Sequence, residues 1–408
     1  MKCYNQRSTW YRGLNMKVPD SFLFSIFQEQ DASIRKKLSE KTLEIATGRR
    51  YQSISDEPPA TYDVLNLKRE IAQLSQYSKN RLFADTNLSY IEFNLGKIQD
   101  MLNNLYAKSV QAKNQILQRE ELRAIGELFS SSLRALLDRF NDKLGENYLF
   151  GGASLTTKPF DENTYQYGAS TEDFRVWLTD NYQVEVFLNG GKTFGLNVAL
   201  SLASFLSTGT AFANSGTLNI TVGTTTVSVS YDNNPASSTP SNLEELVSYI
   251  NTNYSNLMTA KANQNPDGTY SLMLVPKEID KEISVSDTSG GDFGVGFKYP
   301  NVLEAVKRVG DKLLGGMYPD DADLLLLQRA FERVSFRRSQ VGSVLLQVKN
   351  LQPLQENLMD NLNKQKSDIE DADLSESIME YTRYRMAYEA LMRIIADQKD
   401  MTILNYLR

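Results

Sequence analysis

The chain has 408 residues, with 44 basic and 50 acidic side chains and a formal net charge of −6. This length provides for two or three domains with sizeable cores. The basic residues are scattered among acidic ones, which disfavours nucleic acid as a partner. No apolar run reaches the roughly 18 residues that cross a bilayer, so no membrane insertion is expected.

Histidine is absent, and Cys3 is the only cysteine. Without histidine the chain lacks the commonest general base, the commonest transition-metal ligand and any Ser-His-Asp arrangement. One cysteine allows neither an intrachain disulfide nor a thiolate metal site. We therefore expect no catalytic residues, no metal and no cofactor, in a protein that packing and assembly stabilise.

The N-terminal segment contains no apolar stretch of the kind found in secretory signal peptides. We interpret residues 1–15 as an extension and hypothesise that the protein proper starts at Met16.

Residues from about 20 to 150 are predicted to be helical, because apolar residues recur there every three or four positions. The longer stripe consists of Leu88, Ile91, Leu95, Ile98, Leu102 and Leu105. A shorter stripe precedes it and consists of Phe24, Phe27, Ile34, Leu38 and Ile45. Gly48 and the pair Pro58-Pro59 separate the stripes, since glycine favours a helix end and proline cannot continue a helix.

A further helix is predicted from Glu120 to Leu144, followed by the segment GENYLFGGASLTTKPF. Gly151 and Gly152 in this segment are interpreted as the domain junction, where the helix stops and another architecture begins.

Residues from about 150 to 300 are rich in Thr, Ser, Gly and Asn. The alternation in TLNITVGTTTVSVSYD, with Gly223 between two runs, predicts a β-hairpin. Another strand is predicted after Asp-Gly in NPDGTYSLMLVP (Asn265–Pro276). Between them a short helix is predicted over Ser241–Ser255, with Ser241 as its cap and Glu244 three residues on.

Residues 301–408 are again predicted to be helical. Their terminal stripe consists of Ile378, Tyr381, Tyr388, Met392 and Ile395. Basic and acidic residues are mixed on the polar side of this stripe, which disfavours binding to a membrane surface. The sequence thus predicts an elongated α+β protein, in which the N- and C-terminal helices form a coiled-coil-like bundle around an inserted β-rich domain.

The expected domains follow from these regions. They are terminal helices over 16–55 and 371–408, a helical rod over 56–155 and 301–370, and an outer β-rich domain over 156–300. Burying either terminal stripe stabilises its helix by less free energy than the backbone loses in conformational entropy when the segment becomes ordered. We therefore expect the terminal helices to be disordered in the monomer and to fold on assembly.

Two acidic clusters are candidates for a chemical role, the first for cation binding and the second for a general acid/base pair. Asp320, Asp321 and Asp323 follow Pro319 but lack the ligand spacing of a calcium loop, which favours a helix start.

The second cluster, in IEDADLSE (Ile369–Glu376), is interpreted as a solvated helix face. The glycine-rich stretch Gly290–Phe297 does not lead into a helix and fits no phosphate-binding fingerprint.

Four segments in order resemble the bacterial flagellin superfamily. They are ATGRRYQSISDEPP, NYLFGG with a following PF, RAFERVSFRRSQVGSVL and IEDADLSESIMEYTRYRMAYEALMRIIADQKDMTILNYL. The resemblance covers about 16–160 and 301–407, and YLFGG (Tyr148–Gly152) is most similar to the branch at the hook–filament junction.

The resemblance implies a non-enzymatic subunit of the bacterial flagellum that forms a ring and joins the hook to the filament. It implies hook-associated protein 1, flagellin and a cytoplasmic export chaperone as partners, and export without a cleaved signal peptide to an extracellular location. The ten residues of the two terminal stripes are then the expected assembly interface. Two alternatives stay open: a flagellin of the filament itself, and a secreted adhesive or binding module that uses the middle domain.

Overall fold

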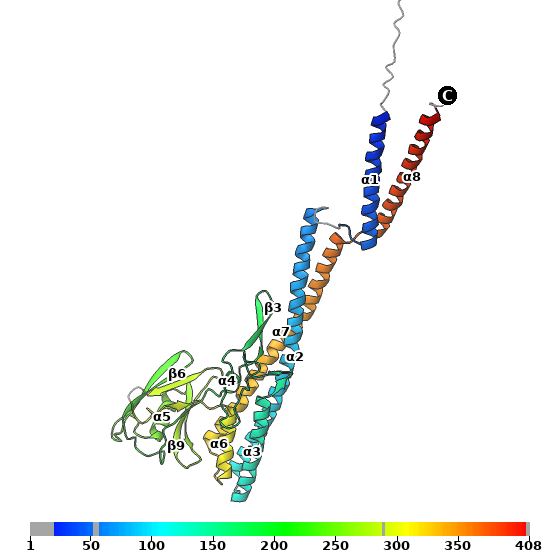
Figure 1. Ribbon diagram of the computed structural model, residues 1–408. Coiled ribbons are helices and arrows are strands. Elements are labelled where there is room, and N and C mark those ends of the chain that lie inside the picture. Colours follow the sequence, from blue (N-terminus) through cyan, green and yellow to red (C-terminus); the bar gives the residue numbers. More distant parts are fainter. Residues whose placement is uncertain (1–19, 52–56, 288–289, 405–408) are drawn as a thin grey trace, which may run out of the picture. The chain divides into compact units, whose positions relative to one another are not determined.

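The computed structural model describes residues 20–51, 57–287 and 290–404. Its helices are α1 (Asp20–Thr47), α2 (Pro58–Asn114), α3 (Arg119–Phe140), α4 (Gly190–Phe194), α5 (Leu243–Asn253), α6 (Val302–Leu314), α7 (Asp321–Glu370) and α8 (Leu374–Leu404). Its strands are β1 (Lys143–Leu144), β2 (Asn147–Tyr148), β3 (Phe174–Thr179), β4 (Tyr182–Phe187), β5 (Ala199–Ser201), β6 (Gly216–Val222), β7 (Thr225–Tyr231), β8 (Met258–Gln264), β9 (Tyr270–Pro276), β10 (Ile283–Asp287) and β11 (Phe297–Lys298). The predicted α+β class is confirmed, with long helices toward both ends of the chain and strands between them (Figure 1).

The chain divides into two compact units, and α2 and α7 run through both. The terminal unit contains the described residues up to Ser75 together with those from Glu356 onward. The central unit is Gln76–Gln355. The domain boundaries expected from the sequence stay a prediction.

The central unit is built on the long apolar stripe of α2. The six predicted stripe residues, from Leu88 to Leu105, are all at most 1% exposed. They share one core with buried residues of α3, α6 and α7. Small residues let α3 and α6 approach closely, since a Cβ on Gly126 would lie 2.8 Å from the backbone nitrogen of Leu314.

The helix before the predicted junction ends earlier than expected. α3 stops at Phe140 and is capped by Asn141, whose side chain also binds the backbone of Phe160. Gly151 and Gly152 therefore do not stop a helix, which corrects that part of the interpretation, while their place at a domain junction stays a prediction. Gly152 has φ +60, and a Cβ there would lie 2.3 Å from the Glu172 carbonyl oxygen.

The β-rich part of the central unit contains two larger sheets. One has the strand order β10-β6-β7, and the other has the order β11-β5-β9-β8. Their core is partly aromatic, with Phe212, Tyr231 and Phe293 in mutual edge contact at centroid distances of 5.1–5.7 Å. The predicted hairpin is confirmed as β6 and β7, and Gly223 has φ +59 at its turn.

The helix cap predicted for this region is one residue off. Asn242, not Ser241, caps α5 and accepts a hydrogen bond from the Glu245 backbone nitrogen. The Glu245 carboxylate instead accepts hydrogen bonds from both the backbone N–H and the hydroxyl of Ser241. The cap is therefore shifted by one residue, because Asn is as good a cap as Ser. The expected reciprocal pattern is not formed, since Glu245 binds Ser241 rather than the cap residue Asn242.

Arginine side chains of α7 donate hydrogen bonds to backbone carbonyl oxygens of the β-rich part. Arg329 donates to Glu278 O at 2.9 Å, and Arg333 donates to Ile279 O at 2.8 Å and Lys192 O at 2.7 Å. Burial, followed by the charges of Arg337 and Arg329, lowers the pKa of Arg333 to about 10.

A buried ion network lies where α7 begins. As predicted, a helix begins among the acids that follow Pro319. One of these acids, Asp323, is fully buried and forms an ion pair with Lys312 of α6, which is also fully buried. Asp320 accepts from Lys312 at 3.0 Å and from the Gln264 backbone nitrogen at 3.0 Å. Burial acts to raise the pKa of Asp320, but the Lys312 ammonium and the backbone N–H groups outweigh it and lower this pKa.

Candidate assembly surface on the terminal helices

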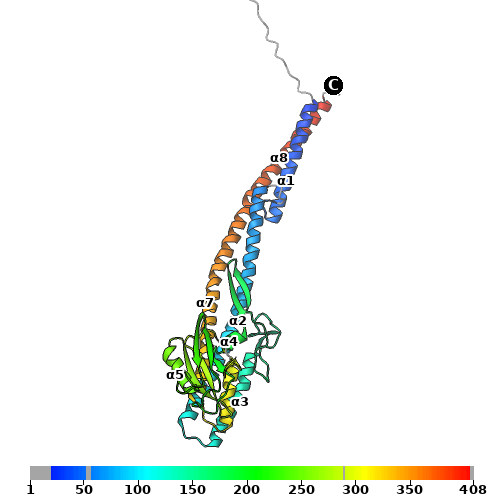
Figure 2. The ribbon, with the colours of Figure 1, turned by 90° about the vertical axis from the view of Figure 1, so that its left-hand side faces the viewer.

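Helices α1 and α8 of the terminal unit lie side by side, as Figures 1 and 2 both show. α1 ends at Gly48, which has φ +69 and donates its N–H to Glu44 O at 2.8 Å. This is the left-handed helix end that glycine favours. α8 begins after Asp373, whose carboxylate accepts from the backbone N–H groups of Ser375 and Glu376 at 2.8 and 3.1 Å.

The connections at these two helix ends are joined by the backbone. Arg50 N–H donates to Glu370 O at 2.8 Å, and Ala372 N–H donates to Gly48 O at 2.9 Å. The Glu370 carboxylate accepts from Lys68 at 2.8 Å and also faces Arg49.

Glu370 is only 9% exposed, so the interpretation of residues 369–376 as a solvated helix face is wrong for this residue, whereas Asp371, Asp373 and Glu376 are exposed. The helical run breaks between Glu370 and Leu374, and Glu370 closes α7 as a partly buried ion-pair acceptor.

Polar contacts cross from α1 to α8 along the pair. Lys41 binds both Glu44 and Glu380, at 2.7 and 2.8 Å, and Ser377 donates its hydroxyl to Glu44 at 2.9 Å. The hydrogen bond from Lys41 lowers the pKa of Glu380, and the hydrogen bond to Glu380, followed by that to Glu44, raises the pKa of Lys41.

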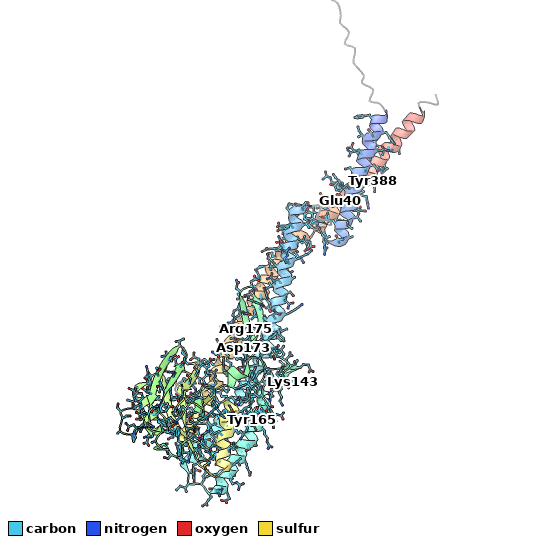
Figure 3. The ribbon with its side chains drawn as sticks, turned by 60° about the vertical axis from the view of Figure 1, so that its left-hand side comes forward. Glu40, Lys143, Tyr165, Asp173, Arg175 and Tyr388 are labelled. Carbon is cyan, nitrogen blue, oxygen red and sulfur yellow. The ribbon has the colours of Figure 1, made fainter. Side chains whose placement is uncertain are left out.

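Two cations of α1 also lie over tyrosine rings of α8. The guanidinium of Arg35 is 5.5 Å from the Tyr388 ring centroid, and the ammonium of Lys37 is 5.2 Å from that of Tyr384. Such contacts contribute about 0.5–1 kcal/mol each at exposed sites. Figure 3 marks Tyr388 on α8 and Glu40 on α1.

The predicted interface residues fall into two groups in the structure. Eight are half-buried, and they are Phe27, Ile34, Leu38 and Ile45 of α1 and Tyr381, Tyr388, Met392 and Ile395 of α8. The other two are exposed: Phe24 at 60% and Ile378 at 51%. The spacing of the half-buried residues places each group of four on one face of its helix, as expected for helices that pack against each other.

Two members of the α8 stripe were not predicted from the sequence. Leu391 is 9% exposed, and Tyr384 contacts Lys37. Both follow from the three–four spacing through Tyr381, Tyr388 and Ile395, which is a signal that the sequence already contained.

A second set of apolar side chains on these helices is left exposed. It consists of Phe22, Phe24, Ile26 and Leu43 of α1 and Leu374, Ile378, Met379, Met386 and Ile394 of α8. Met379 and Met386 are seven residues apart, so they lie on one face of α8. Exposed apolar side chains that gather on one face, as these two methionines do, are typical of interaction sites. The helix pair therefore offers apolar surface that one chain does not cover.

The described part of the chain offers neither a membrane-spanning helix nor a metal site. It contains no helix that is long and apolar enough to span a membrane. It also contains no group of three or more Asp, Glu or Cys residues arranged to hold a metal ion.

The comparisons with known proteins locate similarity at both ends of the chain. Residues 25–153 match the model of the bacterial flagellin N-terminal helical region. Residues 324–407 match that of the bacterial flagellin C-terminal helical region. Together the two regions make up more than half of the chain.

Two curated relatives are named for different parts of the flagellum. Flagellar hook-associated protein 3 of Escherichia coli (strain K12) is 27% identical over 152 residues, which is 37% of this chain and 48% of that protein. The match thus spans about half the length of that relative. Polar flagellin B/D of Vibrio parahaemolyticus is 22% identical over 340 residues, 83% of this chain and 76% of that protein.

A solved structure supports the fold. The crystal structure of flagellar hook-associated protein 3 from Legionella pneumophila aligns with a TM-score of 0.51 at 18% identity, covering 75% of this chain and 98% of that one.

Proposed function

The chain belongs to the bacterial flagellin family, and from this premise we propose that it is a structural subunit that joins the flagellar hook to the filament. The observation that carries the proposal is the similarity to hook-associated protein 3 of Escherichia coli, whose 27% identity exceeds the 22% of the polar flagellin. The subunit acts by binding neighbours rather than by catalysis.

The proposed mechanism rests on α1 and α8. One face of each helix packs against the other helix, and a second apolar surface, which includes Met379 and Met386, is left for neighbouring subunits. Copies of the chain would form a ring through these surfaces, with hook-associated protein 1 on one side and flagellin on the other. In this role Phe24 and Ile378, the two exposed members of the predicted interface, contact other subunits.

The proposal extends to the state of the free subunit. An exposed apolar surface on a two-helix pair gains stability when neighbours cover it, so α1 and α8 become fully ordered on assembly. Before export, a cytoplasmic chaperone with an apolar groove would cover the same surface of α8. The assembled subunit is extracellular, as part of the flagellum.

One observation favours a filament flagellin as the second candidate. The match to the Vibrio flagellin extends over 83% of this chain, whereas the match to hook-associated protein 3 covers 37%. The longer match includes the β-rich part, which the junction role does not itself require.

The experiment is a chromosomal deletion of the coding sequence in the source bacterium, with re-expression of the whole chain. We expect the deletion to leave hooks without filaments while flagellin is exported into the medium, and re-expression to restore attached filaments. Filaments that stay attached in the deletion strain would overturn the junction role. Long filaments formed by the purified chain alone would support the flagellin candidate.

A further inference from the structure

The sheet β10-β6-β7 ends on a strand whose outer edge is open. β7 pairs with β6 in a register that runs from Val222↔Thr225 at the turn to Gly216↔Tyr231. Because hydrogen-bonded and non-bonded pairs alternate from the turn, the backbone groups of Thr226, Ser228 and Ser230 point away from β6. Among the described residues no backbone partner is found for these outward groups.

Two other edge strands of the larger sheets, β10 and β8, have outward backbone groups that side chains bind. On β10 the outward N–H of Val285 donates to the Tyr299 hydroxyl at 3.0 Å. On β8 the outward N–H and C=O of Ala260 are both bound by the Asn251 side chain, at 2.8 and 2.9 Å. Such covering is how proteins prevent strand edges from pairing with other chains.

β7 has none of the usual protective features. Its sequence, TTVSVSY, contains no charge, no proline and no glycine, and its pairing with β6 shows no bulge. A hydrogen bond between the Thr226 and Thr221 hydroxyls at 2.9 Å, and one from the Ser228 hydroxyl to the Asn219 side chain at 2.6 Å, link β7 to β6 on the outer face. An uncharged seven-residue edge of this kind is a template for a further strand.

We propose that β7 pairs with β7 of a second copy of the chain, antiparallel and centred on Ser228. This register places Ser228 opposite Ser228 of the second copy and Thr226 opposite its Ser230. All the outward N–H and C=O groups of Thr226, Ser228 and Ser230 then find partners.

The side chains suit the same register. Val227 faces Val229 of the second copy on the core side of the sheet, and hydroxyl side chains face one another on the outer side. Cross-strand pairs of β-branched residues and of Ser or Thr are favourable, and identical uncharged strands bring no like-charge repulsion. The two three-stranded sheets thereby become one six-stranded sheet.

The symmetry of this contact determines which copies of the chain it can join. A pair centred on one residue has a two-fold axis, whereas subunits of a ring contact each other head to tail. The contact therefore joins free subunits or subunits of separate assemblies. It holds whether the chain is a junction subunit or a flagellin.

The test uses the full-length chain with Cys3→Ser as background, so that each variant carries one cysteine. Facing residues of a hydrogen-bonded antiparallel pair have Cα atoms about 5.5 Å apart, which a disulfide spans. We expect Ser228→Cys to give a covalent dimer on mild oxidation. The matched control is Ser284→Cys, an exposed serine on β10, whose edge is covered; it should stay monomeric.

A second variant tests the contact without a cross-link. Ser228→Pro removes one outward N–H, which an edge strand tolerates. We expect sedimentation to show a concentration-dependent dimer for the unmodified chain and a monomer for Ser228→Pro, with the same circular dichroism. Equal cross-linking of Ser284→Cys and Ser228→Cys, a monomeric unmodified chain, or a Ser228→Pro dimer would each overturn the proposal.

Discussion

At the scale of single residues, Lys312 is a fully buried cation whose charge is matched by Asp323 and Asp320. Lys312→Ala leaves these carboxylates buried without their cation, so we expect the free energy of unfolding to fall by about 3–5 kcal/mol. The apolar double variant Lys312→Met/Asp323→Leu should lower the free energy of unfolding much less, because it removes the cation and its buried partner together. Urea denaturation followed by circular dichroism measures the difference.

The matched control for Lys312 lies on the same helix. Lys307 and Asp311 form an exposed pair, and Lys307→Ala should change the free energy of unfolding by at most about 1 kcal/mol. If Lys312→Ala cost no more than Lys307→Ala, the buried network would not stabilise the fold.

Two glycines with the same backbone conformation separate strain from steric contact. Gly145 and Gly152 have φ of +63 and +60, but only Gly152 faces another segment, at the Glu172 carbonyl. Gly145→Ala should destabilise by about 1–2 kcal/mol through its left-handed backbone alone. Gly152→Ala should cost clearly more, and thermal unfolding of the two variants compares them. Equal losses of stability would show that the segment around Glu172 moves away from the added Cβ without loss of free energy.

At the scale of elements, the pairing of α1 with α8 depends on the ionised state of Glu380. Its pKa is lowered by Lys41, so its contribution to stability is present above its ordinary pKa of 4.5 and is lost as the pH falls below that value. We expect helix content to be lost from the termini as the pH falls below about 4.5, and the stability contribution lost is about 1 kcal/mol or less.

Glu380→Gln tests this assignment, because it keeps the side-chain shape and cannot ionise. Hydrogen exchange of α1 amides should depend less on pH in this variant than in the unmodified chain. An unchanged pH dependence would assign the effect to other carboxylates.

Helices and hairpins were the elements that sequence patterns predicted well. The α2 stripe and the β6–β7 hairpin are regular repeats of one period, and each was confirmed. The sequence predicted the exact ends of helices less well, because neighbouring residues can end or cap a helix with nearly equal energy. Ser241 and Asn242 are both good caps, and nothing in the spacing indicates that α3 stops at Phe140 rather than at Leu144.

The parts that depend on distant partners were not predictable. In the sequence Glu370 is one of several acids in a polar segment. Its buried position depends on pairing with Lys68, which is about three hundred residues away in the chain. Asp323 reads as a helix-start carboxylate, and its burial follows from Lys312 of another helix. For the assembly surface, the stripes identified the packed residues, but only the fold shows which apolar side chains a single chain leaves exposed.

At the scale of the whole molecule, free subunits should be cut first at their ends. Because α1 and α8 keep apolar surface that assembly covers, limited proteolysis of the monomer should remove both termini and leave a fragment of about residues 50–370. Mass spectrometry identifies the fragment. Termini as resistant as the middle would point instead to a self-sufficient protein that needs no assembly to fold.

The central claim is the place of the subunit in the flagellum, and immunogold electron microscopy of intact flagella tests it most directly. An antibody raised against the full chain, adsorbed against cells that lack it, would be used on flagella that keep their hooks. Our account predicts gold at one point, between hook and filament. Gold along the whole filament would contradict it and identify the chain as a flagellin of the filament.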